Sequence, residues 1–351
     1  MANARYWCED LFVIVIPTFS LSQHKKREAD RRYLAEAGMA EYMKAVRIHE
    51  FGGPDVLRYE DVPVPQPGTG EIRIKVIAAG VNPVDWKIRK GLMKIPLPMT
   101  MGFDVSGIVE AIGPKVDGFY PGDQIFAKAS LAHGGYAEYT IVNDSQAALK
   151  PRSIGFIEAA AVPTAGLTAW QMLFDVAGLK SDQKVLIHGA AGGVGSFALQ
   201  FAKWKGAYAI GTASETNRQF LKSLGADEVI DYNAQRFEDV VHDVDVVIDT
   251  IGGDTFDRSW RVLKPGGFLV TSVADVRRGA TDARGVRAEH IVSQADGNEL
   301  AQIAKIIDGR LIEPIVTTVL PLSEARKAQE LSEGRHTRGK IVLRVAEDPK
   351  S

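Results

Sequence analysis

HGAAGGVGSFALQFAK, residues 188–203, follows an apolar run and leads into a segment with helical periodicity. Its spacing, Ala190-x-Gly192-x-x-Gly195, is a variant of the G-x-G-x-x-G fingerprint in which alanine replaces the first glycine. We expect Gly192 to let the backbone approach a pyrophosphate, and Gly195 to let the helix pack closely on the strand. The start of the helix would add free N–H groups. The stretch therefore predicts a strand, a turn and a helix that together bind a dinucleotide.

The segments on either side predict the rest of the architecture. Between Met43 and Ala161, short β-type runs are separated by glycine and proline, as in MKAVRI, EIRIKVIAAGV, SGIVEAIG and AEYTIV. After Ala161, apolar runs alternate with helical patterns, as in VLIHG, YAIGTA, EVIDY, VDVVIDTIGG and GFLVTSV. VDVVID lacks polar alternation, which is typical of a strand covered on both faces. The pattern predicts an α/β fold with a Rossmann-type, doubly wound parallel sheet beside a β-rich domain.

Length, charge and cysteine content limit the function classes. A chain of 351 residues favours two domains. With 42 Lys+Arg against 44 Asp+Glu, the chain lacks the strong positive field of a nucleic-acid-binding protein, so we expect no nucleic-acid partner. Cys8 is the only cysteine, which excludes a disulfide framework within one chain and favours a reducing, cytoplasmic location.

Residues 1–42 differ from the rest of the chain. The apolar run LFVIVIP (11–17) is too short to span a bilayer, and it follows acidic residues where a signal peptide would carry positive charge. We expect an N-terminal extension over 1–42 that is disordered or non-native, with Met43 as the natural start, and no membrane partner. A docking or regulatory segment is the alternative.

The end of the second strand of the predicted sheet indicates which dinucleotide binds. NAD-dependent enzymes usually place Asp or Glu there, about 20 residues beyond the glycines, to bind the ribose hydroxyls. This chain has Thr212-Ala213-Ser214, and the first carboxylate is Glu215. The Ser214 hydroxyl tolerates a 2′-phosphate, and Arg218 could pair with it. We therefore expect NADPH as cofactor, with a merely solvated Arg218 as the alternative.

Motifs over the whole chain from Met43 resemble those of the quinone oxidoreductase and zeta-crystallin group, within the zinc-free medium-chain dehydrogenase/reductase superfamily. They include MKAVRIHEFGGPDVL, AGVNPVDWKIRKG, PMTMGFDVSGIVEAIG, YPGDQIF, GGYAEYTIV, PTAGLTAW, SLGADEVIDY and HTRGKIVLRV, beside the glycine-rich stretch. The resemblance implies a GroES-like catalytic domain of residues 43–163 and 295–351. An NADP-binding Rossmann domain, residues 164–294, would be inserted between its two parts.

The resemblance also implies which chemistry is open to the chain. Zinc alcohol dehydrogenases of this superfamily place a cysteine and a histidine where this chain has Asn82 and Phe103, so we expect no metal. Most histidines are then ordinary surface or strand-end residues: His49, His133, His188, His242, His290 and His336. Without a Lewis acid, the acceptor must already be electrophilic. We expect an NADPH-dependent quinone reductase or alkenal reductase, with a quinone or an α,β-unsaturated carbonyl (enone or enal) as small-molecule substrate. An enoyl-thioester reductase and a non-enzymatic, crystallin-like NADPH-binding protein remain alternatives.

Site residues are carried over from the resemblance position by position. It implies that Asn82 lies near the nicotinamide and Thr168 near the ribose and phosphates. The remaining expected cofactor residues are Ala191, Gly192, Gly193 and Val194 at the pyrophosphate; Ser214, Asn217, Arg218 and Tyr232 at the adenosine end; Ile251 and Val273 at the nicotinamide half; and Arg338 and Lys340 reaching back from the C-terminal part. Related NADPH enzymes often carry lysine at the position of Asn217, so this chain departs from the family pattern there. Candidate catalytic residues of the cleft wall are Asn82, Asp85, Lys87 and Tyr139, and the sequence names no obligatory acid.

A homodimer is expected as well. The run AEHIVSQ (288–294) reads as the last strand of the cofactor sheet, and an unpaired sheet edge needs cover. In related enzymes that edge meets its symmetry mate.

Overall fold

The computed structural model describes residues 41–277, 279–335 and 337–348. The described residues from Met43 onward belong to one compact unit. Residues 1–40 lie outside the described part of the chain, as does His336, so the expectations for the N-terminal extension and for Cys8 stay predictions.

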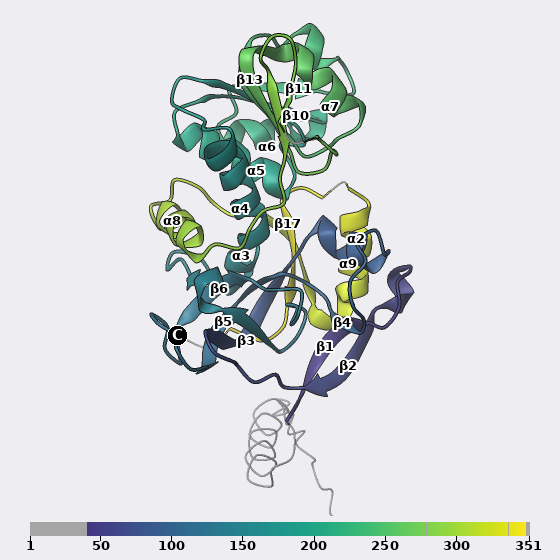
Figure 1. Cartoon of the computed structure of the whole chain (residues 1–351), viewed down its shortest axis with the longest axis vertical. Helices are drawn as coiled ribbons and strands as arrows, with labels where there is room; N and C mark the ends of the chain where they lie inside the picture. The colour runs from purple at the N-terminus through teal and green to yellow at the C-terminus, as the bar shows by residue number, and fades with distance from the viewer. Residues whose placement is uncertain (1–40, 278, 336, 349–351) are drawn as a thin grey trace, which may run out of the picture. The chain divides into compact units, whose positions relative to one another are not determined.

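The predicted Rossmann-type sheet is one of two large sheets in the described part of the chain, and it contains the strand that leads into the glycine-rich turn (Figure 1). Its strands are, in spatial order, β11 (Glu228–Asp231), β10 (Tyr208–Ala213), β9 (Lys184–Ile187), β12 (Val244–Asp249), β13 (Leu263–Thr271), β15 (Arg287–His290) and β14 (Ala280–Thr281). Every neighbouring pair is parallel except β14 with β15. Counted from β9, the parallel strands have the order 3-2-1-4-5-6 of dinucleotide-binding sheets, so the fold prediction is confirmed.

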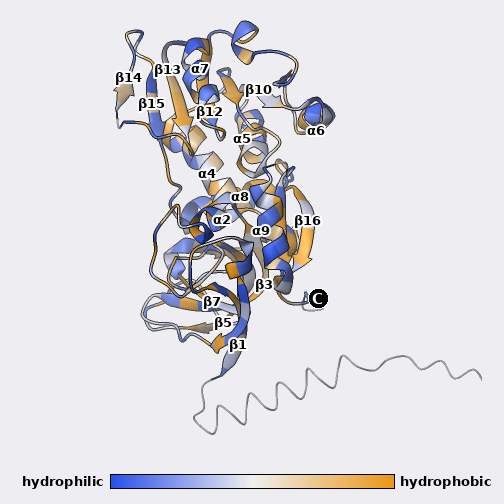
Figure 2. Ribbon diagram, turned by 90° about the vertical axis from the view of Figure 1, so that its right-hand side faces the viewer, coloured by the Kyte–Doolittle hydropathy of each residue, from blue (hydrophilic) through white to orange (hydrophobic). Residues whose placement is uncertain are grey.

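Helices pack against this sheet and against one another in a shared apolar core. They are α4 (Pro163–Trp170), the π-helix η3 (Gln171–Val176), α5 (Gly193–Trp204), α6 (Arg218–Ser223) and α7 (Asp254–Ser259), with short 3-10 turns η4 (Glu215–Asn217), η5 (Phe237–Asp239) and η6 (Trp260–Val262). Trp170 of α4 meets Phe201 of α5 edge to face, with ring centroids 5.5 Å apart. In Figure 2 α6 is mostly hydrophilic, whereas the carboxyl half of β13 is hydrophobic. A hydrophobic strand covered by helices with hydrophilic outer faces is expected of a buried parallel sheet.

The second large sheet joins strands from both ends of the described chain. Its order is β16 (Val316–Pro321), β17 (Lys340–Arg344), β3 (Glu71–Val81), β5 (Asp104–Ile112), β6 (Gln124–Lys128) and β8 (Ala147–Leu149), with β7 (Tyr139–Asn143) also paired to β3. A smaller sheet has the order β2 (Arg58–Pro63), β1 (Tyr42–Ile48) and β4 (Met99–Thr100). The four predicted runs in this half all form strands. The domain limits at 163/164 and 294/295 stay predictions.

The helices that accompany the second sheet in the described part of the chain are η1 (Pro54–Val56), α2 (Pro83–Arg89), η2 (Asp144–Gln146), α3 (Phe156–Ala160), α8 (Gly297–Asp308), η7 (Leu322–Glu324) and α9 (Ala325–Glu333). The fully buried Arg89 holds α2 against α9, because it donates to Gln329 Oε1 at 2.8 Å and to Glu333 Oε2 at 2.7 Å. None of the helices in the described part of the chain is long and apolar enough to cross a membrane.

The edge of the cofactor sheet differs from the prediction. The strand within AEHIVSQ ends at His290, and the two-residue strand β14 pairs outside it, so β14 and not β15 is the last strand. The segment leaves the sheet at this point because Gln171 Oε1 accepts from the backbone N–H of Gln294 at 2.9 Å.

Candidate functional site

The glycine-rich turn joins β9 to α5 through a left-handed residue. Gly189 has φ +67°, and a Cβ there would lie 2.6 Å from Thr250 Oγ1. The residue that needs glycine is therefore one position before Ala190, which is buried in the turn. A Cβ on Gly195 would lie 2.2 Å from the carbonyl oxygen of Gly189. Gly195 thus allows the close approach that the fingerprint predicts, although its contact is with the turn that follows the strand.

The segment that leads into β17 crosses this turn. Gly339 N–H donates to the Ala191 carbonyl at 2.8 Å, and Gly192 and Gly339 form an isolated parallel bridge. A Cβ on Gly193 would lie 2.8 Å from Cδ of Lys340. The N-terminal turn of α5, with its unpaired N–H groups, therefore lies beside residues from the C-terminal part of the chain.

Apolar side chains are exposed at the carboxyl edge of the cofactor sheet. Tyr232, Ile251 and Val273 follow β11, β12 and β13, and they are 58%, 53% and 39% exposed. The turn at Ile251 is fixed by Asp249, whose Oδ1 accepts from the N–H groups of Ile251 and Gly252 at 2.9 and 3.0 Å. Exposed apolar surface beside a glycine turn and a helix N-terminus fits a dinucleotide, whose rings need apolar contacts and whose phosphates need N–H donors.

A polar corner lies at the end of β10. Asn217 Nδ2 donates to Ser214 Oγ at 3.1 Å, and its Oδ1 accepts from Arg338 Nε at 2.9 Å. Arg338 also donates to the Thr216 carbonyl at 3.2 Å and lies over the Phe220 ring at 4.8 Å. The structure thus brings Ser214, Asn217 and Arg338 together, although Arg338 is more than 120 residues away in the sequence.

Arg218 has other partners at this corner. Its Nε donates to both carboxylate oxygens of Glu215 at 2.8 Å, and its Nη1 donates to the Val229 carbonyl at 2.9 Å. Arg218 therefore pairs with Glu215, the first carboxylate after Ser214.

Asp85 is a buried helix cap. Its Oδ2 accepts from the N–H of Asn82 at 2.8 Å and from the Tyr136 hydroxyl at 2.7 Å, which fixes the first turn of α2. Its other oxygen has no hydrogen-bond partner among the described residues. Burial raises the pKa of Asp85 to about 7. Because Asp85 is 0% exposed, it does not line a cleft wall as predicted, and its hydrogen bond from the Asn82 N–H connects it to that residue.

A second buried cluster surrounds the Asn82 side chain. Asn82 Nδ2 donates to Asp104 Oδ2 at 2.8 Å, and Asn82 Oδ1 accepts from Lys340 Nζ. The Lys340 ammonium also donates to the Val81 carbonyl at 2.9 Å and to Asp104 Oδ2 at 3.4 Å. Thr164, at the start of α4, donates to Asp104 Oδ1 through N–H and Oγ1 at 2.9 and 2.5 Å. Four segments therefore meet at one buried ion pair.

The remaining predicted residues occupy different surroundings. Thr168 is buried in α4, and its Oγ1 donates to the Thr164 carbonyl at 2.6 Å. Tyr139 of β7 lies 6.0 Å from the Arg73 guanidinium and packs in an apolar core cluster with Met43 and Val62, so it does not line a cleft wall. Lys87 is half-buried, 5.9 Å from the Trp86 ring. Burial and the nearby Arg335 lower the pKa of Lys87.

Histidines do not gather into a ligand set. His188 lies at the end of β9 and is buried, with hydrogen bonds to Thr212 Oγ1 at 3.1 Å and to Ser259 Oγ at 3.0 Å. Burial lowers the pKa of His188 to about 3, so its ring is neutral. Across the described residues, no three His, Cys, Asp or Glu side chains lie together as metal ligands would.

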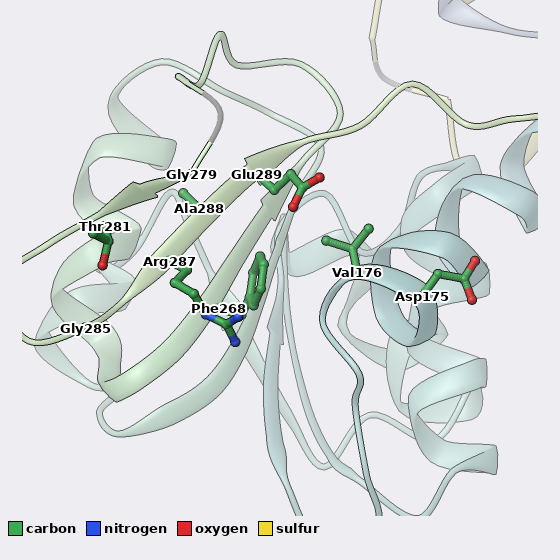
Figure 3. A pocket seen from close by; sticks show the side chains of 9 residues that line it. All are labelled: Asp175, Val176, Phe268, Gly279, Thr281, Gly285, Arg287, Ala288 and Glu289. Atoms are coloured by element: carbon green, nitrogen blue, oxygen red, sulfur yellow. The ribbon is translucent and has the colours of Figure 1, made fainter.

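Figure 3 shows a hollow at the edge of the cofactor sheet, lined by residues of η3, β13, β14 and β15 and of the loops between them. Phe268 and Arg287 lie at its centre, with the Arg287 guanidinium 4.4 Å from the Phe268 ring. None of the predicted cofactor residues lines this hollow.

Sequence reasoning missed the residues that support the site. Asp104 and Thr164 lie within quoted motifs, GFDVSG and PTAGLTAW, but 60 residues separate them. Asp249 ends the buried run VDVVID, so its position after an apolar strand was the available signal.

Comparisons with known proteins agree with this geometry. Residues 68–152 match the alcohol dehydrogenase GroES-like domain, and residues 224–343 match the family model named zinc-binding dehydrogenase. Quinone oxidoreductase of Mus musculus is 33% identical over 86% of this chain and 97% of its own length. NADPH-dependent alkenal/one oxidoreductase of Arabidopsis thaliana is 35% identical over 88% of this chain and 81% of its own length.

A solved structure shows the same fold. Quinone oxidoreductase of Escherichia coli, complexed with NADPH, has a TM-score of 0.79 and 30% identity, and the match covers 86% of this chain and 100% of that chain. Taken with the near full-length relatives and the sheet order, these matches show that the chain belongs to the medium-chain dehydrogenase/reductase family, in its zinc-free quinone oxidoreductase group.

Proposed function

We propose that this chain is an NADPH-dependent oxidoreductase that transfers a hydride to a quinone or to an α,β-unsaturated carbonyl compound. The observation that carries the proposal is the carboxyl edge of the cofactor sheet. There the glycine turn, the exposed Ile251 and Val273 and the Arg338 corner lie along one edge. Relatives named quinone oxidoreductase and alkenal/one oxidoreductase support the same reaction class.

Each end of the cofactor has a place along this edge. The N-terminal N–H groups of α5 would hold the pyrophosphate, beside Ala191, Gly192, Gly193 and Val194. Arg338, held by Asn217, would meet the 2′-phosphate next to Ser214, because part of its guanidinium remains open. Tyr232 would cover the adenine, and Ile251 and Val273 would pack against the nicotinamide.

When bound, NADPH supplies a hydride from C4 of its nicotinamide ring. The protein contributes alignment, removal of water and a hydrogen bond to the oxygen that gains charge. Ile251 and Val273 supply the apolar surface that excludes water. Asn82 has one amide hydrogen beyond the hydrogen bond to Asp104, which makes it the donor that we assign to the nicotinamide side of the site.

The acceptor must already be electrophilic, because the positions that hold zinc ligands in related alcohol dehydrogenases carry Asn82 and Phe103. A quinone or an enone accepts the hydride at a carbon conjugated to a carbonyl, and the charge then moves to oxygen.

An enoyl thioester is a second candidate acceptor. Lys87 and Arg335 lie within 6 Å of the same Trp86 ring, and no described carboxylate pairs with either cation. Two such cations favour a substrate with phosphate groups, such as a coenzyme A thioester.

The experiment is a panel assay that follows NADPH absorbance at 340 nm. We expect turnover with a small quinone or an alkenal, and weaker turnover with NADH in place of NADPH. Comparison of an enoyl-CoA with the same acyl chain on N-acetylcysteamine tests the second candidate. An enzyme that prefers the coenzyme A form, and that loses this preference in Lys87→Met, would identify a thioester reductase. A protein that binds NADPH and reduces none of these acceptors would contradict the proposal.

A homodimer and a cytoplasmic location belong to the same proposal. The sheet ends in a strand of two residues, β14, which leaves much of the edge of β15 without a neighbour. The hollow beside it, with Phe268 and Arg287, offers apolar and charged groups to a second copy. Light scattering at micromolar concentration should give twice the mass of the chain, and a fully active monomer would contradict the dimer. The single cysteine supports a reducing location.

A further inference from the structure

We propose that Lys340 is a positioning residue: its buried ammonium group fixes the Asn82 amide as a hydrogen-bond donor in the nicotinamide half of the site, and it does not hold the cofactor phosphates. The inference rests on the proposed function and adds a residue role to it. Resemblance alone suggests that Lys340 reaches toward the cofactor, and the geometry assigns it a different partner.

The ammonium group of Lys340 has a hydrogen-bond acceptor for each of its N–H groups. A lysine ammonium has three N–H donors. All three are engaged, by Asn82 Oδ1, by the Val81 carbonyl and by Asp104 Oδ2. The Lys340 side chain is 5% exposed. No donor is therefore left for a phosphate without breaking a buried bond.

The orientation of Asn82 follows from its two neighbours. Its Oδ1 faces a cation and its Nδ2 faces the Asp104 carboxylate. A reversed amide would place N–H groups against the ammonium and an oxygen against the carboxylate, which are both repulsive. The ion pair therefore specifies one of two amide orientations. It also polarises the amide, since hydrogen bonds in a chain strengthen one another.

The pair is anchored on both sides of the site. Asp104 Oδ1 is held by Thr164 at the start of α4, and the stem of Lys340 lies against Gly193 at the start of α5. Thus the atoms that orient Asn82 are tied to the helix whose N-terminus would hold the pyrophosphate. This links the donor to the position of the bound dinucleotide.

The test compares Lys340→Met with Lys128→Met. Lys128 is the control, because it is also a lysine near Asp104, opposite it in the sheet register, but it is half-buried and donates to Ser293 and not to Asn82. We expect Lys340→Met to lower kcat at saturating NADPH by about 10- to 100-fold, the usual loss when a reacting group is misplaced or loses its support. We expect the Kd for NADPH to change by less than about threefold, well under one decade of affinity. The deuterium isotope effect with 4-deuterated NADPH should rise, because hydride transfer becomes slower.

A double variant separates positioning from stability. Lys340→Met leaves Asp104 as an unpaired buried charge, so this single variant should also melt at a lower temperature. Lys340→Met with Asp104→Asn removes both charges, and its melting temperature should return toward that of the wild type. Its kcat should stay low, since the amide is still unoriented. Recovery of kcat together with stability would show a purely structural role and overturn the inference.

Two binding readouts are independent of turnover. The nicotinamide fluorescence of bound NADPH should change in Lys340→Met, whereas the Kd for 2′,5′-ADP, which probes the adenosine half, should not. If Lys340 holds a phosphate instead, the Kd for NADPH rises by more than about tenfold, or about 1.4 kcal/mol, and the inference is wrong. A wild type that binds NADPH and reduces no acceptor contradicts the proposed function, and the fluorescence arm still decides the role of Lys340.

Discussion

Two arginines close to Ser214 differ in what their guanidinium groups already hold. Arg218 donates to both oxygens of Glu215 and to the Val229 carbonyl, so its charge is already paired with a carboxylate. Arg338 donates, among the described residues, only to neutral acceptors, Asn217 Oδ1 and the Thr216 carbonyl, and its guanidinium lies 4.8 Å from the Phe220 ring centroid. A phosphate next to Ser214 would find the remaining donors of Arg338 already oriented.

Arg338→Ala should therefore weaken NADPH binding and leave NADH binding nearly unchanged. A charge-assisted hydrogen bond contributes roughly 1.5–3 kcal/mol, so the Kd for NADPH should rise about 10- to 150-fold. Arg218→Ala is the control, and its effect should be smaller because it acts through Glu215. Fluorescence titrations with both cofactors measure the four constants. A larger effect of Arg218→Ala on NADPH would identify Arg218 as the phosphate ligand.

Asp85 should make stability depend on pH in the direction opposite to most carboxylates. Its pKa is raised by burial from 3.8 to about 7, so the folded state keeps this proton to a higher pH than the unfolded chain does. The favourable contribution is complete below about pH 4 and is lost as pH rises through about 7. Asp85→Asn should flatten the change in unfolding free energy over this range, which we expect to be on the order of 1–4 kcal/mol.

Urea unfolding between pH 4.5 and 8 measures this effect. Asp55→Asn is the control, since Asp55 is exposed and pairs with Arg326 on the surface. It should keep the slope of the wild type. An Asp85→Asn protein with the same slope as the wild type would show that the Asp85 carboxyl titrates at its ordinary pH.

At the scale of elements, the glycines in the unit β9–turn–α5 differ in how much space surrounds them. A Cβ on Gly195 would meet the Gly189 carbonyl at 2.2 Å and the Ala190 Cα at 2.7 Å, both backbone atoms that cannot move without shifting the turn. On Gly192 the nearest atom is the Gly189 oxygen at 3.3 Å, and the backbone there is extended. The two positions therefore separate packing within the unit from approach of a ligand.

Gly195→Ala should destabilise the protein by about 1–3 kcal/mol, the usual cost of overpacking, and it should also weaken NADPH by displacing the start of α5. Gly192→Ala should melt within a few degrees of the wild type and still bind NADPH more weakly, because its methyl group would lie where the pyrophosphate approaches. Thermal melts and NADPH titrations on both variants check this. If Gly192→Ala binds NADPH normally, the pyrophosphate does not approach the backbone at Gly192.

Elements with a strong local pattern could be predicted from the sequence, and contacts between distant residues could not. EIRIKVIAAGV forms β3 over its full predicted length, since its apolar run is bounded by glycine and asparagine. The end of AEHIVSQ was predicted wrongly, because the hydrogen bond between Gln294 and Gln171 that draws it from the sheet joins residues 123 apart. In the site, the ion pair of Lys340 with Asp104 and the corner of Arg338 with Asn217 both depend on the return of β17 to the second sheet. No local sequence pattern predicts that β17 pairs with β3, a strand from the other end of the described chain.

At the scale of the whole molecule, the described anchors of the fold begin at Met43. Glu138 exchanges hydrogen bonds with Lys44, and Val46 donates to the Tyr136 carbonyl at 2.8 Å. Met43, Ala45 and Ile48 are buried. All predicted cofactor residues lie beyond this point, within the compact unit Met43–Ser351. All residues predicted for the site therefore lie after Tyr42 in the sequence.

Deletion of residues 1–42 should leave the melting temperature within about 2 °C of the full chain, which corresponds to about 1 kcal/mol for a protein of this size. The Kd for NADPH and the turnover rate should also be unchanged, because no described group of the site is removed. Deletion of residues 1–48 is the matched control. It removes β1 with four buried side chains, Met43, Ala45, Val46 and Ile48, and it should give a protein that melts far lower or does not fold. Calorimetry and light scattering of the two truncated proteins measure stability and mass. If the shorter deletion already lowers the melting temperature, or changes the mass in solution, then residues 1–42 contribute to the folded assembly and the expectation of a dispensable extension is wrong.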